Sequence, residues 1–170
     1  MKSLLYEKCT AAAAAFLLLA LSAAAAVLAS PFLFGQTKDG WLFIRPAAPG
    51  MEFTLRYMHS AMRTPIEEQF LINDSADGFL LKSLRYQAFG AGLPYLAGDG
   101  HFRREGKWFI MDDMDRRLPD FSLRNGVINH GVLTVGSEEW PLDEAMPLGS
   151  ELHLYVAPLW QGYRMKKEIH

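Results

Sequence analysis

The sequence predicts a mainly β protein, with a single β-sandwich or small barrel-like domain preceded by an apolar N-terminal helix. Three observations predict this class. An uncharged apolar run lies near the start of the chain, apolar and polar residues then alternate with a period of two, and turn residues recur between the alternating segments. Nine prolines in 170 residues leave little room for further helices.

The first predicted element is the helix. Cys9 to Thr37 contains no charged side chain, and Ala11 to Leu28 is almost wholly Ala, Leu, Val and Phe. A helix of about 20 apolar residues crosses the hydrocarbon core of a bilayer. We therefore expect residues 1–36 to be either a membrane anchor or a signal peptide, cleaved after Ala29 or after Ala26.

Charges around this run predict its orientation. Lys2, Lys8 and the terminal amine precede it, against the single acidic Glu7, and only Lys38 follows closely. The positive-inside bias then puts the N-terminus in the cytoplasm. The remainder is expected on the periplasmic side of the inner membrane, anchored there or secreted after cleavage. The only cysteine, Cys9, precedes the run, so the exported part folds without disulfides.

Residues 37–160 are expected to form one β-rich exported domain, followed by a polar tail over residues 161–170. Beyond residue 30 the chain carries 15 Lys and Arg against 18 Asp and Glu. Neutralisation of phosphates dominates nucleic-acid affinity, so a slightly acidic domain is a poor nucleic-acid binder. We expect no nucleic-acid partner, and a membrane partner only through an uncleaved N-terminal helix.

Alternation and turn signals place the strands in order along the domain. The segment 123–128 is expected to form a hairpin with 132–135 around Asn129-His130-Gly131. A short helix is an alternative near Asp112 to Arg117. The remaining strands are expected over residues 53–59, 66–72, 79–89, a short segment at Phe102, 108–111, 140–142 and 152–157.

Strand parity suggests a polar site on an apolar face. Pairing Leu55 with Ile72 and Tyr57 with Phe70 makes the apolar faces coincide and puts His59 opposite Glu68. Cross-strand neighbours on one face lie about 5 Å apart at Cβ. Such a pair is a structural ion pair that fixes the register, a ligand-binding pair or half of a catalytic set.

Other chemical motifs are weak. His59 and Ser60 are neighbours that point to opposite faces of a strand, and no Gly-x-Ser-x-Gly elbow is present. The Gly90 to Pro94 segment lacks the third glycine of a dinucleotide loop. His59, His101 and His130 with Glu68 match no compact metal motif, so we expect neither metal nor cofactor.

Three blocks, Phe53 to Ser60, Thr64 to Glu68 and Phe89 to Pro94, resemble domain-of-unknown-function family 1850. The resemblance covers roughly residues 40 to 157, and Ala61 stands where Val is expected in much of the family. It implies a small bacterial protein that is exported or membrane-anchored. Genes of the family often lie beside tripartite ATP-independent periplasmic (TRAP) transporters of the TAXI type, which implies an accessory role in solute uptake.

Three classes of function follow. The preferred hypothesis is an accessory or interaction protein of a TAXI-type transporter, with transporter subunits as partners. The alternatives are a periplasmic small-molecule-binding domain and, less favoured because no nucleophile is evident, a hydrolase using His59 as general base. Gly90 and Gly92 are expected to form a tight turn beside His59. The candidate binding or interaction residues are Tyr57, His59, Ser60, Thr64, Glu67, Glu68, Gly90, Gly92 and Pro94.

Overall fold

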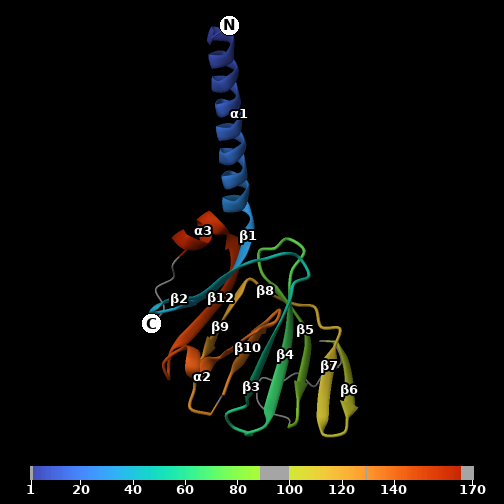
Figure 1. Cartoon of the computed structure of the whole chain (residues 1–170). Coiled ribbons are helices and arrows are strands. Elements are labelled where there is room, and N and C mark those ends of the chain that lie inside the picture. Colours follow the sequence, from blue (N-terminus) through green and yellow to red (C-terminus); the bar gives the residue numbers. More distant parts are fainter. Residues whose placement is uncertain (1, 89–99, 129, 166–170) are drawn as a thin grey trace.

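A long helix, α1 (Lys2–Ala29), projects from a β-rich domain in the computed structural model, which describes residues 2–88, 100–128 and 130–165 (Figure 1). The predicted single helix over Ala11 to Leu28 is confirmed. It ends before Ser30-Pro31, because proline lacks an N–H and disfavours the helical conformation of the residue before it. By length and composition, Ala12–Ala29 is apolar enough to cross a membrane.

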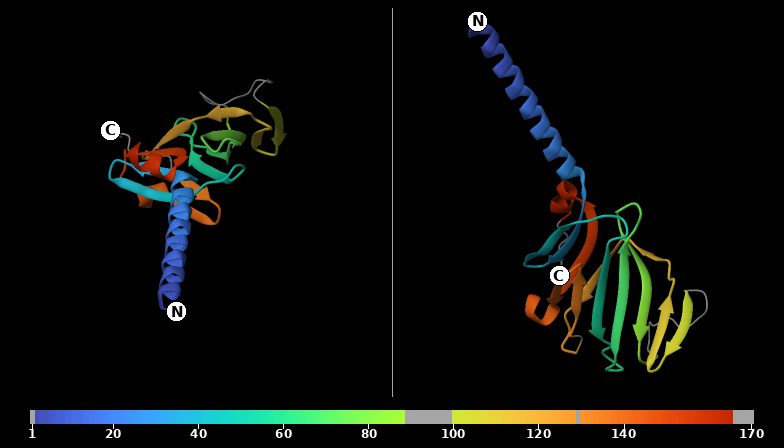
Figure 2. Two further views of the ribbon diagram at one scale, coloured as in Figure 1. Left: turned by 90° about the horizontal axis from the view of Figure 1, so that it is seen from above. Right: turned by 45° about the vertical axis from the view of Figure 1, so that its right-hand side comes forward.

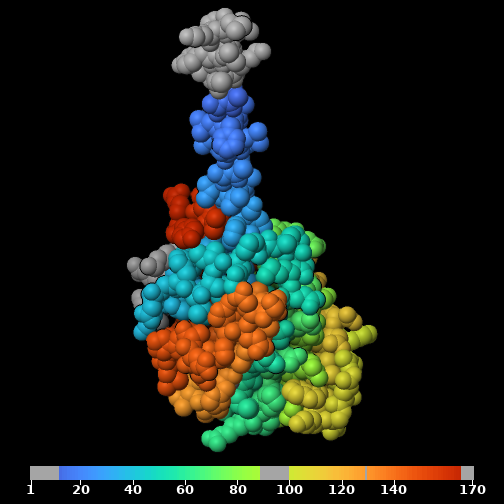
Figure 3. All heavy atoms as spheres, in the orientation of Figure 1, coloured from blue at the N-terminus to red at the C-terminus, as the bar shows by residue number. Residues whose placement is uncertain are grey.

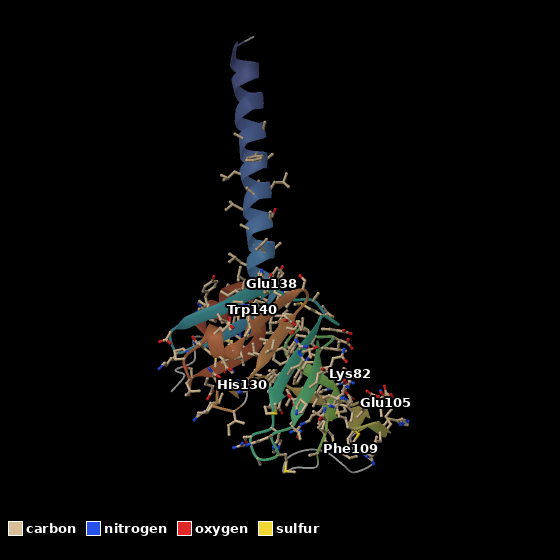
Figure 4. The ribbon with its side chains drawn as sticks, turned by 60° about the horizontal axis from the view of Figure 1, so that its bottom comes forward. Lys82, Glu105, Phe109, His130, Glu138 and Trp140 are labelled. Carbon is tan, nitrogen blue, oxygen red and sulfur yellow. The ribbon has the colours of Figure 1, made fainter. Side chains whose placement is uncertain are left out.

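The β-domain consists of two antiparallel sheets, which confirms the mainly β class (Figure 2). The smaller sheet has the strand order β2-β1-β12-β9, and the larger has the order β11-β10-β3-β4-β5-β7-β6, with β8 also paired to β5. Trp140 in β11 and Glu105 in β6 mark the two edges of the larger sheet (Figure 4). The strands are β1 (Pro31–Thr37), β2 (Gly40–Pro46), β3 (Glu52–Met58), β4 (Pro65–Ile72), β5 (Phe79–Tyr86), β6 (His101–Glu105), β7 (Trp108–Asp112), β8 (Arg116–Leu118), β9 (Asp120–Arg124), β10 (Val132–Val135), β11 (Glu138–Pro141) and β12 (Glu151–Pro158).

One hydrophobic core joins the inner faces of the two sheets. Leu33 of β1 and Leu154 of β12 belong to it together with Phe53 and Phe70 of the larger sheet. The Phe70 ring stacks on Phe121 of β9, with 4.9 Å between centroids. Alternation along the strands therefore directs apolar side chains from both sheets into one interior.

The outer face of the smaller sheet carries a second, aromatic cluster. Phe34 stacks on Tyr155 with 5.0 Å between ring centroids, and Trp41 packs beside them. The short helix α3 (Leu159–Arg164) lies against this cluster, with Gly162 buried over the Phe34 ring. The other short helix, α2 (Leu142–Ala145), follows β11.

The expected boundaries shift at both ends of the domain. The sheet begins at Pro31 rather than residue 37, because β1 pairs with β2 on one side and β12 on the other. Likewise, the expected polar tail begins with helical residues, since α3 runs to Arg164. Both segments are held by the aromatic cluster, whose partners lie far away in the sequence.

Two local predictions are wrong. Segment 123–128 does not pair with 132–135: β9 ends at Arg124 and pairs with β12, whereas β10 pairs with β3 and β11. Residues 112–117 are not helical, because they join β7 to β8, and both of these strands pair with β5. In each case a hydrogen-bonding partner distant in sequence determines the local structure.

Candidate binding site

The candidate site is centred on Tyr57 and Glu68, which project from adjacent strands onto the inner face of the larger sheet. In the β3–β4 register Tyr57 pairs with Ile66 and Glu68 pairs with Leu55, so the two polar residues are diagonal neighbours. The Tyr57 hydroxyl donates a hydrogen bond to Glu68 Oε1, 3.3 Å away. Each therefore partly satisfies the other on a face that is otherwise apolar.

A cavity of about 220 Å³ opens beside this pair. Leu55, Tyr57 and Glu68 form its wall on the larger sheet. The opposite wall comes from β9 and the turns near it, so the cavity lies between the sheets. Its remaining lining residues are Ser122, Leu123, Arg124, Asn125, Gly131 and Leu142.

Burial controls the electrostatics of the pair. It raises the pKa of Glu68 to about 6, although the Tyr57 hydrogen bond and the positive charge of Arg116 in β8 both lower it. The pKa of the Tyr57 phenol is also raised, first by burial and then by the Glu68 charge and the hydrogen bond to it. At neutral pH the cavity therefore contains a protonated phenol and a predominantly ionised, poorly solvated carboxylate.

The predicted pairing of His59 with Glu68 is wrong, although the predicted face of Glu68 is right. Strand β3 ends at Met58, which pairs with Pro65, so His59 lies in the connecting turn. Its N–H donates to the Thr64 carbonyl at 2.9 Å, and its ring Nδ1 accepts the Met62 N–H at 3.2 Å. The register differs by four residues from the prediction, an even slip that keeps every side chain on its predicted face.

The other predicted site residues divide between the turn and the outer face. Ser60 and Thr64 belong to the β3–β4 turn, where they do not line the cavity. Glu67 points to the outer face, where its carboxylate lies 3.4 Å from the Arg85 guanidinium. Gly90, Gly92 and Pro94 lie outside the described residues, so their predicted turn beside His59 remains a prediction.

Sequence reasoning missed the wall opposite Tyr57 and Glu68. Asn125 follows β9 and is buried; its side-chain Nδ2 donates to the Leu142 carbonyl at 3.2 Å and to the Met146 carbonyl at 3.0 Å. These bonds hold the α2 segment against the end of β9. The signal is Asn125-Gly126, a common turn dipeptide that lies inside the strand predicted over residues 123–128.

The histidines considered as metal ligands lie on separate elements. His101 begins β6, and His130 (labelled in Figure 4) lies between β9 and β10. Its Nδ1 is 2.7 Å from Asp143 Oδ2. Among the side chains described for residues 12–88, 100–128 and 130–165, no three His, Cys, Asp or Glu side chains gather as a metal site would require.

These features define a β-sandwich-like domain behind an N-terminal apolar helix, with a cavity between the sheets and a tyrosine–carboxylate pair in its wall. The family model described as Domain of unknown function (DUF1850) matches residues 53–142, more than half of the chain. The protein belongs to this family. Comparison with curated proteins and with solved structures gave no match.

The matched segment contains all of β3 except its first residue, Glu52, and all of β4 to β11. It therefore includes the Tyr57–Glu68 pair and every residue lining the cavity. The smaller sheet is only partly covered, since β1, β2 and β12 lie outside the match.

Proposed function

We propose that this domain binds a small molecule in the cavity between its sheets, with Glu68 as the polar anchor. The observation that carries the proposal is the Tyr57–Glu68 pair in the cavity wall. Burying a carboxylate is costly unless it is hydrogen-bonded, and a strand position on an apolar face readily accepts an apolar residue instead. A ligand that hydrogen-bonds Glu68 gives this costly arrangement a function.

The cavity limits the size of the ligand. An engineered apolar cavity of about 150 Å³ in another protein holds benzene, so about 220 Å³ suits a molecule of roughly ten non-hydrogen atoms. Leu55, Leu123 and Leu142 supply apolar walls for a hydrocarbon body.

The charge of Glu68 limits the chemistry of the ligand. An ionised carboxylate only accepts hydrogen bonds, and Tyr57 supplies one donor. An ammonium group would supply further donors and a compensating charge, which together make a charge-assisted hydrogen bond. We infer that the ligand is a small amine with an apolar body.

Thermal unfolding with a matched pair of probes tests this proposal. Phenethylamine and 3-phenylpropionate have similar apolar bodies and opposite charges. We expect the amine alone to raise the melting temperature, because a ligand at 100 times its Kd stabilises the folded state by about 2.7 kcal/mol. Glu68→Gln should abolish the shift. Glu67→Gln, one residue away on the outer face, is the matched control and should retain it. Equal shifts in wild type and Glu68→Gln would refute the proposed anchor.

We further propose that the domain acts outside the cytoplasm as an accessory protein of a TAXI-type transporter. The basic residues before the apolar run, Lys2 and Lys8, support this orientation, and what the family resemblance implies about neighbouring transporter genes supports the partner. Affinity purification of the tagged full chain should recover the membrane subunit of such a transporter. The membrane subunit of an unrelated transporter, expressed at the same level, is the control, and equal recovery of both would contradict the specific association.

A further inference from the structure

The segment that follows β12 returns the chain to the base of α1. The N–H of Leu159, the first residue of α3, donates to the Ser30 carbonyl at 3.1 Å. Ser30 directly follows the last residue of α1. Figures 1 and 3 both show α3 beside the lower end of the projecting helix. A short helix therefore lies next to the point where the apolar run meets the β-domain.

The packing of α3 is fixed on its inner side. A Cβ added to Gly162 would overlap the buried Phe34 ring, so glycine is required at this contact. The Tyr155 hydroxyl donates to the Gly162 carbonyl at 3.0 Å. Because Gly162 packs against the aromatic cluster, the orientation of α3 on the domain is fixed, and so is the direction of its exposed side.

The exposed side of α3 presents aromatic side chains together with the polar Gln161 and the basic Arg164. Trp160 is 48% exposed, and Met165, just after the helix, is 47% exposed. Tyr163 is 56% exposed, while one edge of its ring packs against Trp41 with 5.8 Å between centroids. The last turns of α1 add exposed Val27 and Leu28 at the same level. Trp and Tyr are enriched where membrane proteins cross the boundary between hydrocarbon and water. An exposed Trp beside the end of an apolar helix fits that boundary.

We propose that α3 is a membrane-interface element: Trp160 and Tyr163 insert at the headgroup level of the leaflet from which α1 emerges. The length of α1 supports the membrane surface as the partner of α3. Ala12–Ala29 contains 18 residues, or about 27 Å of helix, close to the roughly 30 Å of a bilayer core. When that window lies in the hydrocarbon, Ala29 and the adjoining α3 lie at its surface. The proposal depends on α1 staying in the membrane, but not on any ligand or transporter.

Tryptophan quenching in vesicles tests the insertion. The full chain is reconstituted in phosphatidylcholine vesicles that contain lipid spin-labelled near the headgroup. Trp160→Phe should remove most of the quenched emission, because Trp160 is 48% exposed beside the end of α1, whereas Trp41 is partly buried against Tyr163. Trp108→Phe is the matched control: Trp108 lies in β7, toward the edge of the larger sheet, and its loss should leave the quenched component unchanged.

A second measurement guards against misfolding of the variant. This measurement uses the wild-type chain in two lipid environments. Backbone hydrogen exchange of residues 159–164 should be at least several-fold slower in vesicles whose hydrocarbon thickness matches the length of α1 than in detergent-free nanodiscs of short-chain lipid. Equal quenching in wild type and Trp160→Phe would overturn the proposal, and so would unchanged exchange of α3 with quenching confined to other tryptophans. Either result would leave this face to a second chain or a transporter subunit.

Discussion

The two ends of the β3–β4 ladder follow the same alternation but contain different groups. At one end Phe53 pairs with Phe70, their rings stack at 5.0 Å, and Phe121 fills the space above them. At the other end the same inner face carries Tyr57 and Glu68 beside a cavity. Strand periodicity thus fixes which side chains face inward, while residue identity makes one end a packed core and the other a polar pocket.

The largest expected effect is at the packed end. Phe70→Ala should destabilise the fold by about 3–5 kcal/mol, because the ring is 2% exposed and contacts two other rings. Chemical denaturation of the full chain in detergent measures it. A loss below about 1 kcal/mol would mean that the aromatic end is not the stabilising half of the ladder.

At the pocket end the expected effect depends on pH. The pKa of Glu68 is raised from 4.5 to about 6 in the folded state, so between these values the folded protein binds more protons than the unfolded chain. Stability from this group is therefore complete below about pH 4.5 and decreases as the pH rises through 6, by about 1–2 kcal/mol.

Glu68→Gln isolates this contribution, since an amide cannot ionise. The difference in unfolding free energy between wild type and the variant should change over pH 4.5–6 and level off above it. A difference that stays constant from pH 4 to pH 7.5 would show that Glu68 has an ordinary pKa. The Glu67→Gln variant provides the comparison for a carboxylate on the outer face.

The smallest expected effect is at Gly131 in the cavity lining. A Cβ there would meet the Leu142 Cδ1 at 2.9 Å, but this flexible side-chain end borders the cavity and has space to move. Gly131→Ala should therefore cost well below the roughly 1–3 kcal/mol typical of overpacking. Gly162→Ala is the contrasting variant, because its Cβ would meet the tightly held Phe34 ring. Similar losses for both variants would argue against free space beside Leu142.

The sequence predicted the mainly β class and the inward face of Glu68, because both depend on local alternation. It could not distinguish registers that differ by four residues, since each keeps the apolar faces matched. The observed register depends on the length of the turn between β3 and β4 and on the stacking of Phe53 on Phe70. That stacking exists only when the strands are paired. His59 therefore moved from the predicted pair into the turn.

Long-range pairing explains the other differences. Residues 31–36 extend the uncharged run, and hydropathy alone assigns them to the N-terminal segment. They form a strand because β2 and β12 supply hydrogen-bonding partners on both sides. Asn125 became part of the cavity wall for a similar reason: its two side-chain hydrogen bonds reach the α2 segment and the loop after it.

A single residue, Ser30, separates the last turn of α1 from the first strand of the domain. Its hydroxyl donates to the Ala26 carbonyl and its own carbonyl accepts from Leu159, so the joint is bonded on both sides. One residue spans at most about 3.6 Å, which leaves almost no slack. Helices adapt to bilayers of different thickness by tilting. If α1 stays in the membrane, as proposed above, a change in bilayer thickness would, through this stiff joint, turn the whole β-domain and change the direction in which its cavity opens relative to the membrane plane.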